Sequence, residues 1–339
     1  MRVLTQETFP NKLKLDAKDK QILAYLALDV RIPYTTLAKK VLLSPDAVRY
    51  RIDRLKQEQV LIGTRTLVSL GALGFSSYHL FLSLHPPNLK KEADYIRFFE
   101  TDSRVNAALQ YMGKWDFELA VVSKTPKDLD SFRVDLSQRC PTIQEERIIL
   151  LLETLKSTAL PERIFPDLRM NPASEKIKKK IKMSKLDEKD HHILSVLAEE
   201  ADMKVEKIVE KTKLSRDIVS YRMKRLVESG VIVGFRPIIN YTRLGFSIYA
   251  VLFKLQVRSV ERERSLRTFL QESPAVLWAV RTLGEWDLLI YIIGKDTEDF
   301  YRTIVEIREG FADMIKNYEA LIAYREYKYT YLPEIITQR

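Results

Sequence analysis

The chain repeats itself at a fixed spacing, and this repeat restricts its fold more than any other feature. The segment LDAKDKQILAYLA begins at Leu15 and returns as LDEKDHHILSVLA at Leu186, so the spacing between these two numbers is 171 residues. The same spacing relates GKWD at Gly113 to GEWD at Gly284. Solenoid repeats have periods of about 20–50 residues. The longer period predicts two fused copies of one complete protomer.

Composition sets outer limits on the class of protein. Hydrophobic residues make up 46% of the 339 residues and charged residues 30%, which suits packed domains and excludes wholesale disorder. A single cysteine, Cys140, and four histidines exclude a disulfide framework and a cysteine-based zinc cluster, so we expect no metal and no cofactor. The start of the chain lacks the apolar region of a signal peptide, and no apolar run reaches ~18 residues. We therefore expect a cytoplasmic protein.

The positive charge is concentrated between the two copies. The net charge is +10, and residues 156–185 contain nine Lys or Arg against three Asp or Glu. A basic protein suits a polyanionic partner such as nucleic acid. The basic run is either an arm that contacts phosphates or a solvated connector, and the sequence leaves both interpretations open.

The first part of each copy is predicted to form three short helices. Asp16 and Asp187 suit the N-cap of the first helix, and Ser44-Pro45 suits the start of the third. At 100° per residue, Val48, Ile52 and Leu55 form one apolar stripe of that third helix. Arginine and tyrosine side chains lie away from this stripe, an arrangement typical of a helix-turn-helix that places its last helix in the major groove.

Candidate DNA-binding residues follow from this arrangement, because Arg binds guanine edges or phosphates and Tyr can donate to phosphate. Short β-branched runs at 60–63 and 231–234 suit wing strands, and one arginine follows each of them. The candidates in the first copy are Ser44, Arg49, Tyr50, Arg51, Arg54 and Arg65. Those in the second copy are Ser215, Arg216, Ser220, Tyr221, Arg222, Lys224, Arg225 and Arg236. The alternative is that these residues simply form a charged, solvated face.

The second part of each copy alternates strands and helices in the order βαββαβ, which predicts a ferredoxin-like α/β fold. The expected elements of the first copy are strands at 78–84, 105–112, 117–122 and 146–152, with helices at 89–100 and 129–138. Those of the second copy are strands at 248–257, 275–283, 288–293 and 318–327, with helices at 260–271 and 297–308. This fold hosts many functions and by itself identifies none.

Together these patterns predict an α/β (α+β) chain with two tandem copies of a winged helix-turn-helix followed by a ferredoxin-like domain. The expected segments are a tail (1–14), the first winged helix-turn-helix (15–70), the first effector or pairing domain (71–157), the basic linker (158–185), the second winged helix-turn-helix (186–241) and the second effector or pairing domain (242–339).

The helix-turn-helix segment LSPDAVRYRIDRLKQEQVLIG, with a Gly-x-Trp-Asp hairpin at the right distance, resembles the Lrp/AsnC family of transcription regulators. The resemblance implies DNA binding through the helices at 45–57 and 216–228. It also implies that the second domains pair sheet to sheet and sense a small effector, commonly an amino acid, beside the hairpin. The residues matching that hairpin are Gly113, Trp115, Asp116, Gly284, Trp286 and Asp287. A plain structural hairpin is the alternative.

The sequence also departs from the family pattern. The usual family member carries one copy, and its last helix-to-strand step carries a Gly-Val pair and threonines. Here that step reads RCPT at 139–142 and GFAD at 310–313. The predicted outward faces of the third helices differ between the copies. The first copy has Arg49 where the second has Ser220, and it has Asp53 where the second has Lys224. We therefore expect two half-sites that need not be identical.

Three classes of function compete. The first is a sequence-specific, nucleoid-associated DNA-binding regulator with two reading heads and no enzymatic activity. Its βαββαβ domains pair within the chain or between chains, and the sequence leaves open whether a small-molecule effector modulates it. The second is an enzyme, because siroheme decarboxylases resemble this family and consist of two related subunits. The four histidines form no matched pair in the two copies, and we identify no catalytic carboxylate cluster. The third is an architectural DNA-binding protein without sequence preference.

Overall fold

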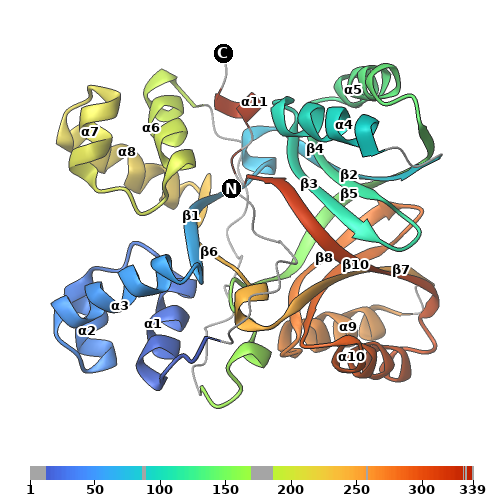
Figure 1. Ribbon diagram of the computed structural model, residues 1–339. Helices are drawn as coiled ribbons and strands as arrows, with labels where there is room; N and C mark the ends of the chain where they lie inside the picture. The colour runs from blue at the N-terminus through green and yellow to red at the C-terminus, as the bar shows by residue number, and fades with distance from the viewer. Residues whose placement is uncertain are drawn as a thin grey trace.

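The computed structural model describes residues 13–85, 89–168, 186–256, 259–330, 332 and 334–337. Two small helical heads lie on one side of the molecule and a β-barrel with its covering helices lies on the other (Figure 1). We call residues 15–60 the first head and residues 186–231 the second head. Residues 169–185 of the basic linker and residues 1–12 of the predicted tail fall outside the described residues.

Each head consists of the three helices expected from the sequence. They are α1 (Ala17–Leu28), α2 (Tyr34–Val41) and α3 (Pro45–Gln57) in the first head, and α6 (Glu188–Glu199), α7 (Val205–Thr212) and α8 (Arg216–Glu228) in the second. Asp16 caps α1 through a capping box with Asp19, and Ser44 caps α3 by accepting from the Ala47 amide. The stripe Val48, Ile52 and Leu55 is buried as predicted.

The strands that follow the heads pair with each other. β1 (Leu61–Val68) and β6 (Ile232–Ile239) form a two-stranded antiparallel ribbon in which Arg65 lies opposite Arg236. The sequence suggested wing strands for each copy separately, whereas here the strand that follows each head takes its hydrogen-bonding partner from the strand that follows the other head. This cross-pairing holds the two heads side by side (Figure 1).

The predicted βαββαβ order is confirmed in both copies. The first contains β2 (Ser76–Leu84), α4 (Leu89–Thr101), β3 (Val105–Met112), β4 (Phe117–Ser123), α5 (Pro126–Arg139) and β5 (Ile143–Ser157). The second contains β7 (Ser247–Leu255), α9 (Val260–Glu272), β8 (Val276–Gly284), β9 (Leu288–Gly294), α10 (Thr297–Gly310) and β10 (Ile315–Tyr329). Short helical turns, η1 (Gly71–Leu73), η2 (Glu162–Ile164) and η3 (Thr242–Leu244), and the helix α11 (Glu334–Thr337) complete the described elements.

The two sheets close into one eight-stranded barrel in the order β10-β3-β4-β2-β5-β8-β9-β7. Strands from different copies meet at the β10–β3 and β5–β8 pairs, so the two copies pair within one chain. Closing a sheet on itself removes its unpaired edges. β5 and β10 are longer than predicted, at 15 residues each, because each pairs with its own sheet at one end and with the opposite copy at the other.

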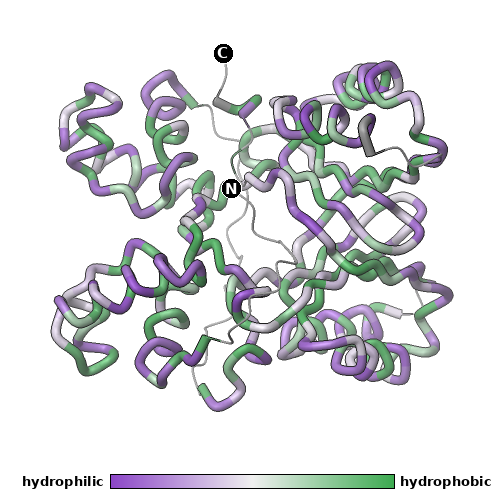
Figure 2. The backbone as a smooth tube through the Cα atoms, viewed as in Figure 1, coloured by the Kyte–Doolittle hydropathy of each residue, from purple (hydrophilic) through white to green (hydrophobic). Residues whose placement is uncertain are grey.

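Hydrophobic side chains fill separate layers on the two faces of the barrel wall. α4 and α5 cover the first sheet through residues such as Phe99 and Phe132, and α9 and α10 cover the second through Leu270 and Ile304. Hydrophobic residues follow the strands, and hydrophilic residues are frequent on the surrounding helices (Figure 2). α5 begins earlier than predicted because Thr125 forms a capping box ahead of Pro126. Among the described residues, no helix is long and apolar enough to cross a membrane.

Candidate nucleic-acid interface

The last helix of each head presents a polar face to solvent. Tyr50 on α3 is 68% exposed, and its counterpart Tyr221 on α8 is 66% exposed. Arg49, Ser220 and Lys224 are also exposed on these helices. Ser44 and Ser215 cap the two helices, so their hydroxyl groups already accept from the amides of the first turn. Both tyrosine side chains are therefore accessible at the surface of the heads.

Four of the candidate arginines are engaged within the heads. Arg51 donates to Asp19 at 2.8 Å, and Arg54 contacts the other oxygen of the same carboxylate. Arg222 and Arg225 bind the equivalent Asp190 in the second head, with 3.1 Å between Arg222 and the carboxylate. Both aspartates are fully buried, so the arginines neutralise charges that would otherwise lack a partner. Their first role is therefore to hold the first helix against the third.

The placement of Arg65 and Arg236 does not fit the expectation that they touch DNA. Arg236 is only 6% exposed and donates to the carbonyl oxygens of Ala27 and Leu28 at the end of α1. Arg65 lies over the ring of Tyr329, 4.2 Å from its centre, and forms an ion pair with Glu326. These contacts direct both guanidinium groups toward other parts of the protein.

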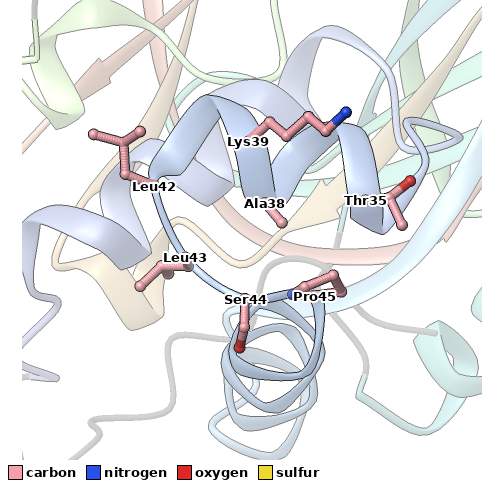
Figure 3. Close-up of a pocket in the computed structure, with 7 residues that line it drawn as sticks. All are labelled: Thr35, Ala38, Lys39, Leu42, Leu43, Ser44 and Pro45. Atoms are coloured by element: carbon pink, nitrogen blue, oxygen red, sulfur yellow. The ribbon is translucent and has the colours of Figure 1, made fainter.

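A pocket marks the turn of the first helix-turn-helix. It lies between the end of α2 and the start of α3 (Figure 3), where Leu42 adopts a left-handed conformation and is 81% exposed. The lining residues are Thr35, Ala38, Lys39, Leu42, Leu43, Ser44 and Pro45. The pocket therefore opens next to the first turn of α3.

The two Gly-x-Trp-Asp hairpins lie at the seams between the copies. Gly113 and Gly284 have φ angles of +147° and +142°, a region that favours glycine. A Cβ at Gly284 would lie 2.6 Å from the Ile148 carbonyl oxygen on β5, so no larger residue fits there. Asp116 and Asp287 accept from the amides of Leu84 and Leu255 at 2.7 and 2.8 Å. The carboxylates thus already tie each hairpin to its own sheet.

The two hairpin tryptophans differ in their partners. Trp115 is fully buried, and its indole N–H donates to Glu319 of the other copy at 2.8 Å. Trp286 is 3% exposed, and its indole N–H has no hydrogen-bond partner among the described residues. A buried donor without a partner is uncommon in proteins. The second hairpin therefore has an unused donor that the first lacks.

A buried polar cluster inside the barrel was not predicted from the sequence. Glu118 is fully buried and accepts from Tyr111, from Tyr291 of the other copy at 2.8 Å, and contacts the His79 ring. Burial raises the pKa of both tyrosines well above the usual value, so their hydroxyl groups act as donors. Trp278 stacks on His79 with 5.8 Å between ring centres. The one available signal was Glu118 itself, a lone carboxylate in the apolar run 117–122.

Family models match three parts of the chain. Residues 15–56 match the AsnC-type helix-turn-helix domain, residues 186–233 match a winged helix-turn-helix DNA-binding domain, and residues 250–333 match the Lrp/AsnC ligand binding domain. The two helix-turn-helix matches agree with the tandem repeat.

Similar curated proteins are single-copy regulators. The HTH-type transcriptional regulator Ptr1 of Methanocaldococcus jannaschii is 33% identical over 121 residues, which cover 36% of this chain and 80% of Ptr1. The DNA-binding transcriptional activator DecR of Escherichia coli K12 is 28% identical over 149 residues, which cover 43% of this chain and 95% of DecR.

A solved structure resembles the chain over most of its length. The crystal structure of the siroheme decarboxylase NirDL aligns with a TM-score of 0.60 and 12% identity, and the alignment covers 93% of this chain and 94% of that one. At this identity the likeness concerns the fold, and it shows that another chain has the same tandem architecture. The matching domain models and the identity with Ptr1 show that the chain, which repeats the helix-turn-helix and the βαββαβ order, belongs to the Lrp/AsnC family.

Proposed function

We propose that this chain is a sequence-specific DNA-binding transcription regulator that acts at the chromosome and is not an enzyme. One observation supports this function most directly: an exposed tyrosine occupies the same place on the last helix of both heads, and the heads are joined by a shared ribbon. Helix-turn-helix proteins bind two half-sites with two such helices. The names of the regulators Ptr1 and DecR agree with this function.

A mobility-shift assay with duplexes selected from a random library tests the proposal. We expect Tyr50→Ala and Tyr221→Ala each to weaken binding about fivefold, the effect of losing one hydrogen bond of roughly 1 kcal/mol. Tyr301→Ala is the matched control, since Tyr301 is 61% exposed on α10 and distant from the heads in sequence and fold (Figure 1). Salt-dependent binding without sequence preference would instead favour an architectural protein.

We also propose that the hairpin residues Gly113, Trp115, Asp116, Gly284, Trp286 and Asp287 frame a site for a small effector such as an amino acid. The unpartnered indole N–H of Trp286 supports the second hairpin as the binding one, because a carboxylate is a suitable acceptor for it. The melting temperature of the protein, measured with individual amino acids added, tests whether the second hairpin binds an effector. Trp286→Phe should abolish a ligand-induced shift, whereas wild-type response in that variant would refute the assignment.

The whole-chain likeness to NirDL and the buried His79–Glu118 cluster favour a second candidate, an enzyme that acts on a tetrapyrrole. Within the barrel, however, the Glu118 carboxylate is already satisfied by both tyrosines and His79. Incubation with an iron-uroporphyrin separates the two candidates. A shifted absorbance band that His79→Ala removes would favour the enzyme, and an unchanged spectrum would favour the regulator.

A further inference from the structure

The two heads differ in charge although they share one fold. The first head contains nine basic and six acidic residues between 15 and 60, and the second contains nine basic and ten acidic residues between 186 and 231. Binding to a duplex draws much of its free energy from the neutralisation of phosphates by Lys and Arg. The heads are therefore unequally suited to hold the DNA backbone.

Ion pairs within the heads increase this difference. Lys39, Arg49 and Lys56 are exposed in the first head and form no ion pair with any described residue. Four exposed basic residues of the second head lie beside carboxylates. The pairs are Arg216 with Glu206 at 3.2 Å, Lys207 with Glu200 at 4.0 Å, Lys224 with Glu228 at 3.8 Å, and Lys211 in contact with Glu199. Carboxylates therefore neutralise several exposed cations of the second head, although Lys189, Lys204 and Lys213 are exposed there and form no ion pair with any described residue.

The difference is clear on the helix that precedes the recognition helix. In helix-turn-helix proteins this helix crosses the DNA backbone. In the first head it is α2, which exposes Lys39 beside the pocket at the turn (Figure 3). At the spacing of the repeat, the counterpart on α7 is Glu210, which is also exposed. One head therefore offers a cation where the other offers a carboxylate.

The heads are also fixed relative to each other by contacts that differ on the two sides. Arg31 of the first head donates to the carbonyl oxygens of Ala201 and Met203 at 2.7 and 3.0 Å. In the reverse direction Arg236 donates to Leu28 at 2.7 Å. These contacts and the shared ribbon hold the two heads in one relative placement.

Building on the proposed function, we infer that one chain binds a non-palindromic duplex in a single orientation. The first head binds the phosphate backbone, and the second head contributes base contacts with fewer phosphate contacts. The two half-sites differ in sequence, and the chain carries both reading heads in a fixed order along the duplex.

Directed cleavage of DNA tests the orientation. Asp46 and Asp217 are equivalent, exposed residues in the first turns of α3 and α8, so Asp46→Cys and Asp217→Cys form a matched pair that removes the same charge. An iron–EDTA reagent attached to either cysteine cuts the nearby DNA. The native Cys140 is 1% exposed, and burial raises its pKa to about 12, so it stays unlabelled. The probe DNA is a duplex selected by the unmodified chain.

We expect each labelled chain to cut one flank of the selected duplex, with the two variants cutting opposite flanks. Cleavage of both flanks by each variant, to within about twofold, would overturn the inference while leaving DNA binding intact. Failure of the unmodified chain to select or shift any duplex would refute the proposed function itself, so the two failures are distinguishable.

A charge exchange tests which head grips the backbone. Lys39→Glu should weaken binding by about tenfold at 0.1 M salt and reduce the salt dependence by about one phosphate contact. Glu210→Lys should strengthen binding. The double variant Lys39→Glu/Glu210→Lys keeps the net charge, so wild-type affinity in it would show that location is irrelevant and would overturn the assignment. We expect the double variant to bind more weakly than the wild type.

Discussion

The hydroxyl group of Tyr291 donates a 2.8 Å hydrogen bond to Glu118, so the second copy completes a buried polar cluster of the first. The repeat places Ala120 at the position equivalent to Tyr291, and Leu289 at the position equivalent to Glu118. Two first copies paired together would therefore leave Glu118 without this donor. Since a buried carboxylate needs its donors, the cluster favours pairing between unlike copies.

Removal of that donor should destabilise the barrel. Tyr291→Phe leaves the fully buried Glu118 with one hydrogen bond fewer, and the expected loss is about 1–3 kcal/mol in the free energy of unfolding. Urea denaturation measures it. Tyr301→Phe, at a 61% exposed position, is the control and should leave stability unchanged. Equal stability of Tyr291→Phe and wild type would show that the cluster does not secure the pairing of the copies.

The arginines of the third helices should affect stability before they affect DNA binding. Arg54→Ala and Arg225→Ala each remove a charged donor from a fully buried aspartate, Asp19 or Asp190. We expect each change to cost about 1–3 kcal/mol of stability, measured by thermal unfolding of the heads. Tyr50→Ala should leave stability unchanged. A variant Arg54→Ala of native stability with lost DNA binding would restore the arginine as a direct DNA contact.

Periodicity and caps were enough to predict the tandem repeat, the buried stripe of α3 and the βαββαβ order, because these depend on local sequence. The roles of Arg54 and Arg236 were not predictable in this way. Arg54 lies opposite the apolar stripe in a helical projection, yet its long side chain reaches Asp19 on a neighbouring helix. Arg236 lies within β6, which pairs with the strand that follows the other head. Partners more than 30 residues away leave no periodic signal in the sequence.

The junction between the heads should depend on Arg236. Its guanidinium group is buried and donates to the carbonyl oxygens of Ala27 and Leu28. Arg236→Met keeps much of the side-chain volume and removes both donors, so we expect faster amide hydrogen exchange at the end of α1 and a loss of about 2 kcal/mol in stability. Arg243→Met is the comparison variant, because it removes the hydrogen bonds from Arg243 to Glu58 in the same junction, and Glu58 is a more exposed acceptor. Unchanged exchange in Arg236→Met would show that the ribbon alone fixes the heads.

Lys156 on β5 should give the barrel an unusual dependence on alkaline pH. Burial lowers its pKa from 10.5 to about 8, although the ammonium group donates to the Ser273 carbonyl oxygen. Between about pH 8 and 10.5 the unfolded chain keeps a proton that the folded chain has lost, so this group makes stability rise with pH in that window. Below pH 8 both states are protonated and the cost of burying the charge is present in full. Lys156→Met should therefore melt at a higher temperature than the wild type at pH 7. This advantage should shrink as the pH rises from 8 to 10, because the wild type gains stability there and the variant does not. Parallel stability profiles for Lys156→Met and wild type across this range would show that the lysine is charged and solvated in the fold.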